Sequence, residues 1–115
     1  MVKCKKTLIL FLIILYSYTN IAKAIESAAH KVEVAKCFGI IMTIKNNSEY
    51  KENIFKATKI IDLYIEKIIN LNIGSSMMKE MSEQAASEVF NRLNSHTPES
   101  LDKLLDKCIS TLRIG

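Results

Sequence analysis

The hydrophobic and polar positions divide the chain into one apolar run, Leu8 to Leu15, followed by segments of helical spacing. In those later segments apolar residues recur at every third or fourth position, which is typical of amphipathic helices. The pattern predicts helices over Glu26 to Lys45, Ser48 to Asn72, Ser76 to Asn94 and Thr97 to Arg113. Because the connections are short, successive helices should be antiparallel. The expected fold is all-α, a small four-helix up-down bundle.

The second segment has the clearest pattern. Its apolar positions alternate in spacing between four and three residues, which places them in one seam along a helix: Tyr50, Ile54, Ala57, Ile61, Tyr64, Ile68 and Leu71. We expect Ile60, Ile65 and Ile69 to widen this seam into a buried face. Ser48 is the expected N-cap, and Asn72 with Gly74 should end the helix.

The fourth segment begins with Thr97 and Pro98, a typical N-cap followed by proline at the first helical position. Its apolar stripe contains Leu101, Leu105, Cys108 and Leu112. Cys108 should therefore face the core, where its sulfur can reach another helix.

The first segment carries two apolar seams. One is made largely of small residues, Ala28, Val32, Ala35, Gly39 and Met42, and it allows a second helix to approach closely. The other contains Cys37. Since the second half of this segment is apolar nearly all round, it should be either the central helix or part of an interface.

The third segment has the weakest pattern and is rich in methionine. Met77, Met78 and Met81 can fill gaps in a core or form an adaptable binding surface. We interpret them chiefly as core residues. With Phe38 and Phe90 they also define a possible ligand or partner face.

The N-terminal stretch has the features of a cleaved signal peptide. Its apolar run is less than half of the roughly 20 residues that a spanning helix needs. Lysines precede the run, and Ala22 and Ala24 supply the small residues that signal peptidase recognises. We therefore expect residues 1–24 to be a signal peptide, cleaved after Ala24, and residues 25–115 to be the helical domain. Membrane contact should occur only through this leader before cleavage.

Cleavage changes the charge of the protein. The leader contains four of the 16 basic residues and no acidic residue, so 16 minus 4 leaves 12 basic residues against 12 acidic ones. The mature chain is therefore neutral, and we expect no nucleic-acid binding.

Two cysteines, Cys37 and Cys108, follow the predicted cleavage site. An even number of cysteines in a short exported chain indicates a disulfide, whereas in a reducing compartment both would be buried thiols. Cys37 lies past the middle of the first predicted helix and Cys108 past the middle of the fourth. Antiparallel packing of these helices would bring the two sulfurs level. The sequence predicts a Cys37–Cys108 disulfide and a secreted or periplasmic protein.

No motif for catalysis, phosphate binding or metal binding is present in the sequence. His30 lies one turn from Glu26 and from Glu33, which could form a metal site, but a solvated charged face has the same spacing. We expect no enzyme activity, metal or cofactor. Asn46 begins an N-x-S sequon, which matters only in a eukaryotic secretory pathway.

Export, a stapled scaffold and the missing catalytic set together favour a protein-binding module, for instance one that masks a partner in the manner of an inhibitor or immunity protein. Three alternatives stay open. The bundle could carry a small apolar ligand between its helices, act as an envelope stress chaperone, or form a homodimer through its first or second helix.

Overall fold

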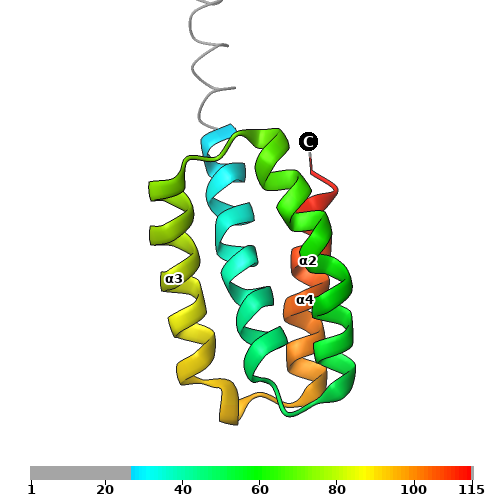
Figure 1. Cartoon of the computed structure of the whole chain (residues 1–115). Helices are drawn as coiled ribbons and strands as arrows, with labels where there is room; N and C mark the ends of the chain where they lie inside the picture. Colours follow the sequence, from blue (N-terminus) through cyan, green and yellow to red (C-terminus); the bar gives the residue numbers. More distant parts are fainter. Residues whose placement is uncertain (1–26, 115) are drawn as a thin grey trace, which may run out of the picture.

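The structure, a computed structural model, describes residues 27–114. Over this range the chain forms an N-terminal helix (residues 27–47), α2 (Lys51–Leu71), α3 (Ser75–Asn91), the short 3₁₀ helix η1 (Leu93–Ser95) and α4 (Pro98–Leu112). Successive α-helices run in opposite directions, which confirms the predicted four-helix up-down bundle (Figure 1). None of the helices described has the length and apolar character needed to cross a bilayer. The predicted cleavage site at Ala22 and Ala24 lies outside the described residues.

The N-terminal helix is the central element of the bundle. It lies between α3 on one side and the pair α2 and α4 on the other (Figure 1). Every residue from 34 to 45 is buried or half-buried. The apolar surface predicted either a central helix or part of an interface, and the structure shows a central helix.

The core lies where the N-terminal helix meets α2 and α4. Its fully buried large side chains are Val34, Ile41, Ile44, Tyr64, Leu101 and Leu105, with Cys108 beside them. In contrast, α3 buries only Ala85 and Val89. The third segment, which had the weakest apolar pattern, is thus also the helix least embedded in the core.

One face of α2 differs from the prediction. Ala57, Ile61 and Tyr64 are buried as expected, but Ile65 and Ile69 are 44% and 70% exposed. Successive helical residues are rotated by about 100°, so Ile65 follows Tyr64 out of the buried seam. The expectation that these two isoleucines widen the buried face was wrong.

The start of α2 also differs from the prediction. The N-cap is Tyr50, which makes no side-chain capping bond, and not Ser48. The backbone N–H of Ser48 donates to the carbonyl oxygen of Ile44 at 3.1 Å, so Ser48 completes the last turn of the N-terminal helix. Its hydroxyl oxygen accepts from the backbone N–H of Tyr50 at 3.1 Å, which stabilises the connection.

The predicted start of α4 is confirmed. Thr97 and Ser100 form a capping box in which each side-chain oxygen accepts from the other residue's backbone N–H, at 3.1 and 2.9 Å. Pro98 occupies the first helical position. This end of α4 is joined to α2 by Asn53, whose Nδ2 donates to the carbonyl oxygen of Pro98 at 3.1 Å.

A cluster of three charged residues joins α2 to α4 at the surface. Lys56 Nζ lies 2.6 Å from Asp102 Oδ1 and 2.6 Å from Asp106 Oδ1. Hydrogen bonds to these two carboxylates raise the pKa of Lys56 above its usual value. Helical spacing places Asp102 and Asp106 on one face of α4, but only the fold brings Lys56 between them.

Candidate functional site

A groove of about 380 Å³ lies between the N-terminal helix, α3 and α4. The lining comes from three parts of the chain and includes no residue of α2. The N-terminal helix contributes Glu33, Lys36, Cys37 and Ile40; α3 and its C-cap contribute Gln84, Ala85, Glu88, Val89 and Arg92; and the last segment contributes His96, Leu104, Lys107 and Cys108.

The groove exists because α3 packs against the N-terminal helix and stands away from α4. No Cα atom of α3 lies within 8 Å of a Cα atom of α2 or α4. In contrast, α3 meets the N-terminal helix so closely that a Cβ atom on Gly39 would lie 2.1 Å from the carbonyl oxygen of Ser82. The close helix approach that the small residues predicted is confirmed at Gly39.

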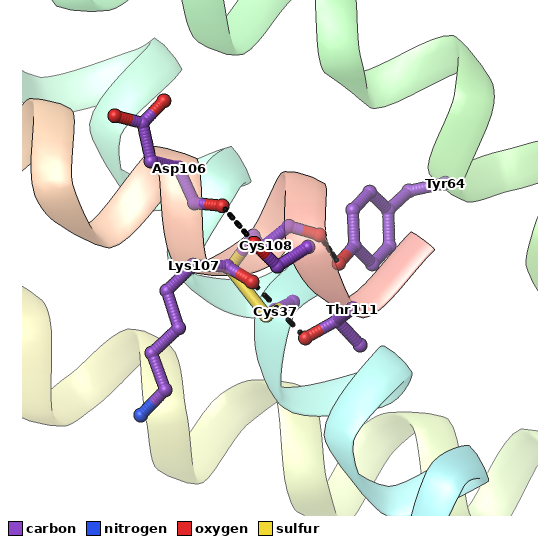
Figure 2. The surroundings of a disulfide bond; sticks show 7 residues. Cys37, Tyr64, Asp106, Lys107, Cys108 and Thr111 are labelled. Carbon is purple, nitrogen blue, oxygen red and sulfur yellow. Dashed lines mark hydrogen bonds between the residues drawn. A yellow bond between two sulfur atoms is a disulfide. The ribbon is translucent and has the colours of Figure 1, made fainter. Parts of the chain in front are cut away.

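The floor of the groove is apolar and contains the disulfide. Cys37 and Cys108 are bonded, with their Cα atoms 5.6 Å apart, which confirms the predicted bridge (Figure 2). Both residues are almost fully buried, with 4% and 1% of their surface exposed. The accessible part of the floor is therefore formed mainly by the apolar side chains that flank the disulfide, such as the half-buried Ile40 and Leu104.

Tyr64 supports the disulfide from the core side. Its hydroxyl group donates to the carbonyl oxygen of Cys108 at 2.5 Å, as Figure 2 shows. One turn of α4 further on, Thr111 Oγ1 donates to the carbonyl oxygen of Lys107 at 3.2 Å. Burial raises the pKa of Tyr64 well above its ordinary value of 10.0. The phenol is thus held in its protonated, hydrogen-bonding form.

Replacing Tyr64 with phenylalanine should lower the free energy of unfolding by about 1 kcal/mol near neutral pH, because one buried hydrogen bond is lost. The wild-type protein should also lose stability as the pH rises above about 10. There the unfolded state releases the Tyr64 proton, while the folded state retains it. Urea unfolding at several alkaline pH values measures both effects. A Tyr64→Phe variant with an unchanged alkaline slope would contradict this assignment.

The rim of the groove carries charges of both signs. Glu33 and Glu88 supply negative charge, and Lys36, Arg92 and Lys107 supply positive charge. All except the half-buried Lys36 are exposed. His96 also lines the groove, with its Nδ1 3.0 Å from the hydroxyl oxygen of Ser100. The site therefore combines an apolar floor with a charged border that solvent can reach.

Only part of the possible metal triplet lies among the residues that the structure describes. No group of three or more His, Cys, Asp or Glu residues in residues 27–114 is arranged to hold a metal ion. His30 is half-buried, and its Nε2 has no hydrogen-bond partner. Burial, and secondarily the charge of Lys67, lower the pKa of His30. Of the other two residues of this triplet, Glu26 lies outside the described range and Glu33 is exposed.

The aromatic and methionine residues that the sequence indicates as a possible binding face do not line the groove. Phe38, Met77, Met78 and Met81 are half-buried, while Phe90 is 58% exposed on α3. Of the residues that do line the groove, the sequence pattern points only to Cys37 and Cys108, as the disulfide, and to Glu33, as one residue of the possible metal triplet. The others are ordinary helix-surface residues whose convergence depends on the position of α3.

The charged, partly apolar groove is thus the candidate functional site. It contains no arrangement of nucleophile and base among the residues that line it, since both sulfurs are joined in the disulfide. Comparison with known proteins adds no second line of argument. No protein-family model, curated protein or solved structure matches this chain at a significant level.

Proposed function

We propose that this protein is a non-catalytic binding module that holds a segment of a partner protein in the groove between the N-terminal helix, α3 and α4. The observation that carries the proposal is the apolar floor with the disulfide, framed by charges of both signs. Protein interfaces have this anatomy, with an apolar centre and a polar rim. Charges of both signs on the rim favour a partner that also carries both, as peptide segments do.

The groove has the length of a short peptide segment. Its lining runs over residues 33–40 of the N-terminal helix and residues 84–92 of α3 and its cap. At 1.5 Å per residue each wall is roughly 12 Å long, or about two helical turns. We propose that a two-turn amphipathic helix lies along the mouth of the groove, with one apolar side chain directed down toward Ile40 and Leu104.

The scaffold suits masking of a partner. A disulfide joins the central helix to α4 at the groove floor, so the site is preorganised and little conformational entropy is lost on binding. The same bond fits an oxidising compartment. We propose that the protein works in the periplasm or outside the cell, as an inhibitor- or immunity-like protein.

A small apolar ligand is the second candidate. A volume of about 380 Å³ falls within the range of about 300–1,000 Å³ found for small-molecule sites. Such sites bury most of the ligand surface, whereas the rim here is exposed and charged. The protein segment therefore remains the leading proposal.

Charge reversal on the rim tests the proposal. Arg92→Glu together with Lys107→Glu should weaken partner capture about tenfold, because both exposed cations border the groove. The matched control is Arg113→Glu with Lys79→Glu, which makes the same charge change outside the groove. Arg113 caps the C-terminus of α4 as Arg92 caps α3, so the two arginines also match in helix position.

The measurement is quantitative affinity capture from extracts of the native host, with wild-type protein and both variants side by side. A protein retained by the wild type and the control, and lost with the groove variant, supports the proposal. Equal loss with both variants, or capture that neither variant changes, would contradict it. Native mass spectrometry of the host-purified protein tests the second candidate, because a bound small molecule adds mass to the intact chain.

A further inference from the structure

Two lysines accompany the disulfide on the side of the groove. Lys36 directly precedes Cys37 in the N-terminal helix, and Lys107 directly precedes Cys108 in α4. Both lysines line the groove, one from each helix. Figure 2 shows the Lys107 side chain extending away from the disulfide and from Tyr64. The bridge therefore holds two cations on neighbouring helices beside the groove.

The two lysines lie at nearly the same height in the bundle. The N-terminal helix and α4 run in opposite directions, and the disulfide makes residue 37 level with residue 108. Residue 107 is then level with residue 38, two positions from Lys36, which is about 3 Å along the bundle axis. The same bond holds the two helices with their Cα atoms 5.6 Å apart at this point. One anionic group can therefore approach both lysines.

Neither lysine is paired with an acid within residues 27–114. Lys56 shows the contrast, since two carboxylates of α4 hold its Nζ at 2.6 Å. No carboxylate in the described part of the chain forms a salt bridge with Lys36 or Lys107. Glu33 lies one turn before Lys36 and also lines the groove, but it is bridged to neither lysine. Like charges held near one another repel, and an anion between them relieves the repulsion.

An apolar pair lies one helical turn from the lysine pair. Ile40 is four positions after Lys36, and Leu104 is three positions before Lys107. Because the two helices are antiparallel, both steps lead in the same direction, toward η1 (Figure 1). Ile40 and Leu104 are half-buried and line the groove. The groove thus presents two cations and, about 5 Å further along, two apolar side chains.

We propose that the groove selects a helical partner segment in which an acidic residue lies one turn from an apolar residue. Such selectivity rests on the function proposed above, because it belongs to the same groove. The partner's carboxylate lies between Lys36 and Lys107, while its apolar side chain lies over Ile40 and Leu104. Residues three or four positions apart share one face of a helix, so a two-turn segment presents both groups together. The apolar contact supplies affinity, and the lysine pair supplies the choice of partner.

Short helical peptides test this preference directly. The probes are two-turn peptides, held helical by a hydrocarbon link on the opposite face, with a leucine and a glutamate one turn apart in either order. Matched peptides carry glutamine or lysine in place of glutamate. In NMR titrations of the purified protein, expressed as the full chain, signals of Ile40 and Leu104 should shift. In at least one order the glutamate peptide should bind about fivefold more tightly than the glutamine peptide, and the lysine peptide more weakly than both.

Substituting the two lysines should remove the preference. With Lys36→Gln and Lys107→Gln together, the glutamate and glutamine peptides should bind equally. The matched control is Lys79→Gln with Lys103→Gln, which removes two exposed lysines outside the groove. Glutamine is a good helix former, so circular dichroism should show unchanged folding for both variants. In the wild type, added salt should reduce the preference, because solvent reaches both groove lysines.

The possible failures are distinguishable. Equal binding of glutamate and glutamine peptides in both orders would overturn the acid preference and leave the groove as a binding site. The same conclusion follows if Lys36→Gln with Lys107→Gln keeps the preference, or if the control variant loses it equally. If no peptide shifts the signals of Ile40 and Leu104, both the acid preference and the proposed binding function are contradicted.

Discussion

Removing the Cys37–Cys108 disulfide should lower the free energy of unfolding by about 4 kcal/mol. The bond joins residues 71 positions apart, and closing so long a loop removes much of the conformational freedom of the unfolded chain. Domains of this size are typically stable by only about 5–15 kcal/mol. Urea unfolding of the Cys37→Ala, Cys108→Ala variant should therefore show a much lower midpoint than the wild type.

The location of the bond adds to its effect. It ties the central helix to α4 where Tyr64 of α2 also hydrogen-bonds to Cys108. Reductant should shift the wild-type midpoint toward that of the double variant and leave the variant itself unchanged. If the wild type and the variant unfold at the same urea concentration without reductant, the disulfide makes no net contribution and the prediction is wrong.

Gly39→Ala should lower the free energy of unfolding by about 1 kcal/mol, although alanine is the better helix former. The helix preference alone favours alanine by about 1 kcal/mol. This preference is opposed by a steric clash. The Cβ atom of an alanine at residue 39 would lie 2.1 Å from the carbonyl oxygen of Ser82, and this contact requires α3 to move. Overpacking of this kind typically costs about 1–3 kcal/mol. Here the atom in the way belongs to the backbone of α3, which cannot turn aside as a side chain can. Thermal and urea unfolding measure the net effect.

Gly74→Ala provides the control for this substitution. No atom lies within 4 Å of a Cβ atom added at Gly74, and its φ of −65° suits alanine. This variant should change the free energy of unfolding by less than about 1 kcal/mol, because the restriction of the unfolded chain by alanine offsets its poorer fit at the N-cap of α3. If Gly39→Ala behaves like Gly74→Ala, α3 can give way freely and the close approach does not stabilise the bundle.

Gly39 connects stability to the proposed function. α3 forms one wall of the groove, and it buries only Ala85 and Val89. Its position therefore depends on the contact at Gly39 and on the short connections at its ends. A side chain at residue 39 that moves α3 outward should change the width of the groove as well as the free energy of unfolding.

Much of the fold could be predicted because its signals are local. Thr97 and Pro98 mark the start of α4 through backbone hydrogen bonding within one turn. The spacing of the apolar residues in α2, which alternates between three and four positions, identifies Ala57, Ile61 and Tyr64 as a buried stripe. Cys37 and Cys108 could be paired because no other cysteine follows the predicted leader and both lie on apolar seams.

The failures of prediction concern which neighbour covers which face. Ile65 and Ile69 lie beside the buried seam of α2, yet no helix of the bundle covers them. Ser48 has the chemistry of an N-cap, yet it ends the preceding helix by donating to Ile44. In both cases the local pattern is correct for a helix, and the arrangement of the neighbouring helices decides the outcome.

The amino-acid sequence by itself determined the helices, the buried stripes of α2 and α4 and the pairing of Cys37 with Cys108. These depend on spacing, capping and cysteine number, which are properties of the chain before it folds. Only the tertiary structure decided that the N-terminal helix is central and that α3 stands away from α4. The groove and the exposure of Ile65 and Ile69 on α2 follow from these positions. Helix periodicity specifies which residues share a face, whereas long-range packing, such as Gly39 against Ser82, specifies what that face meets.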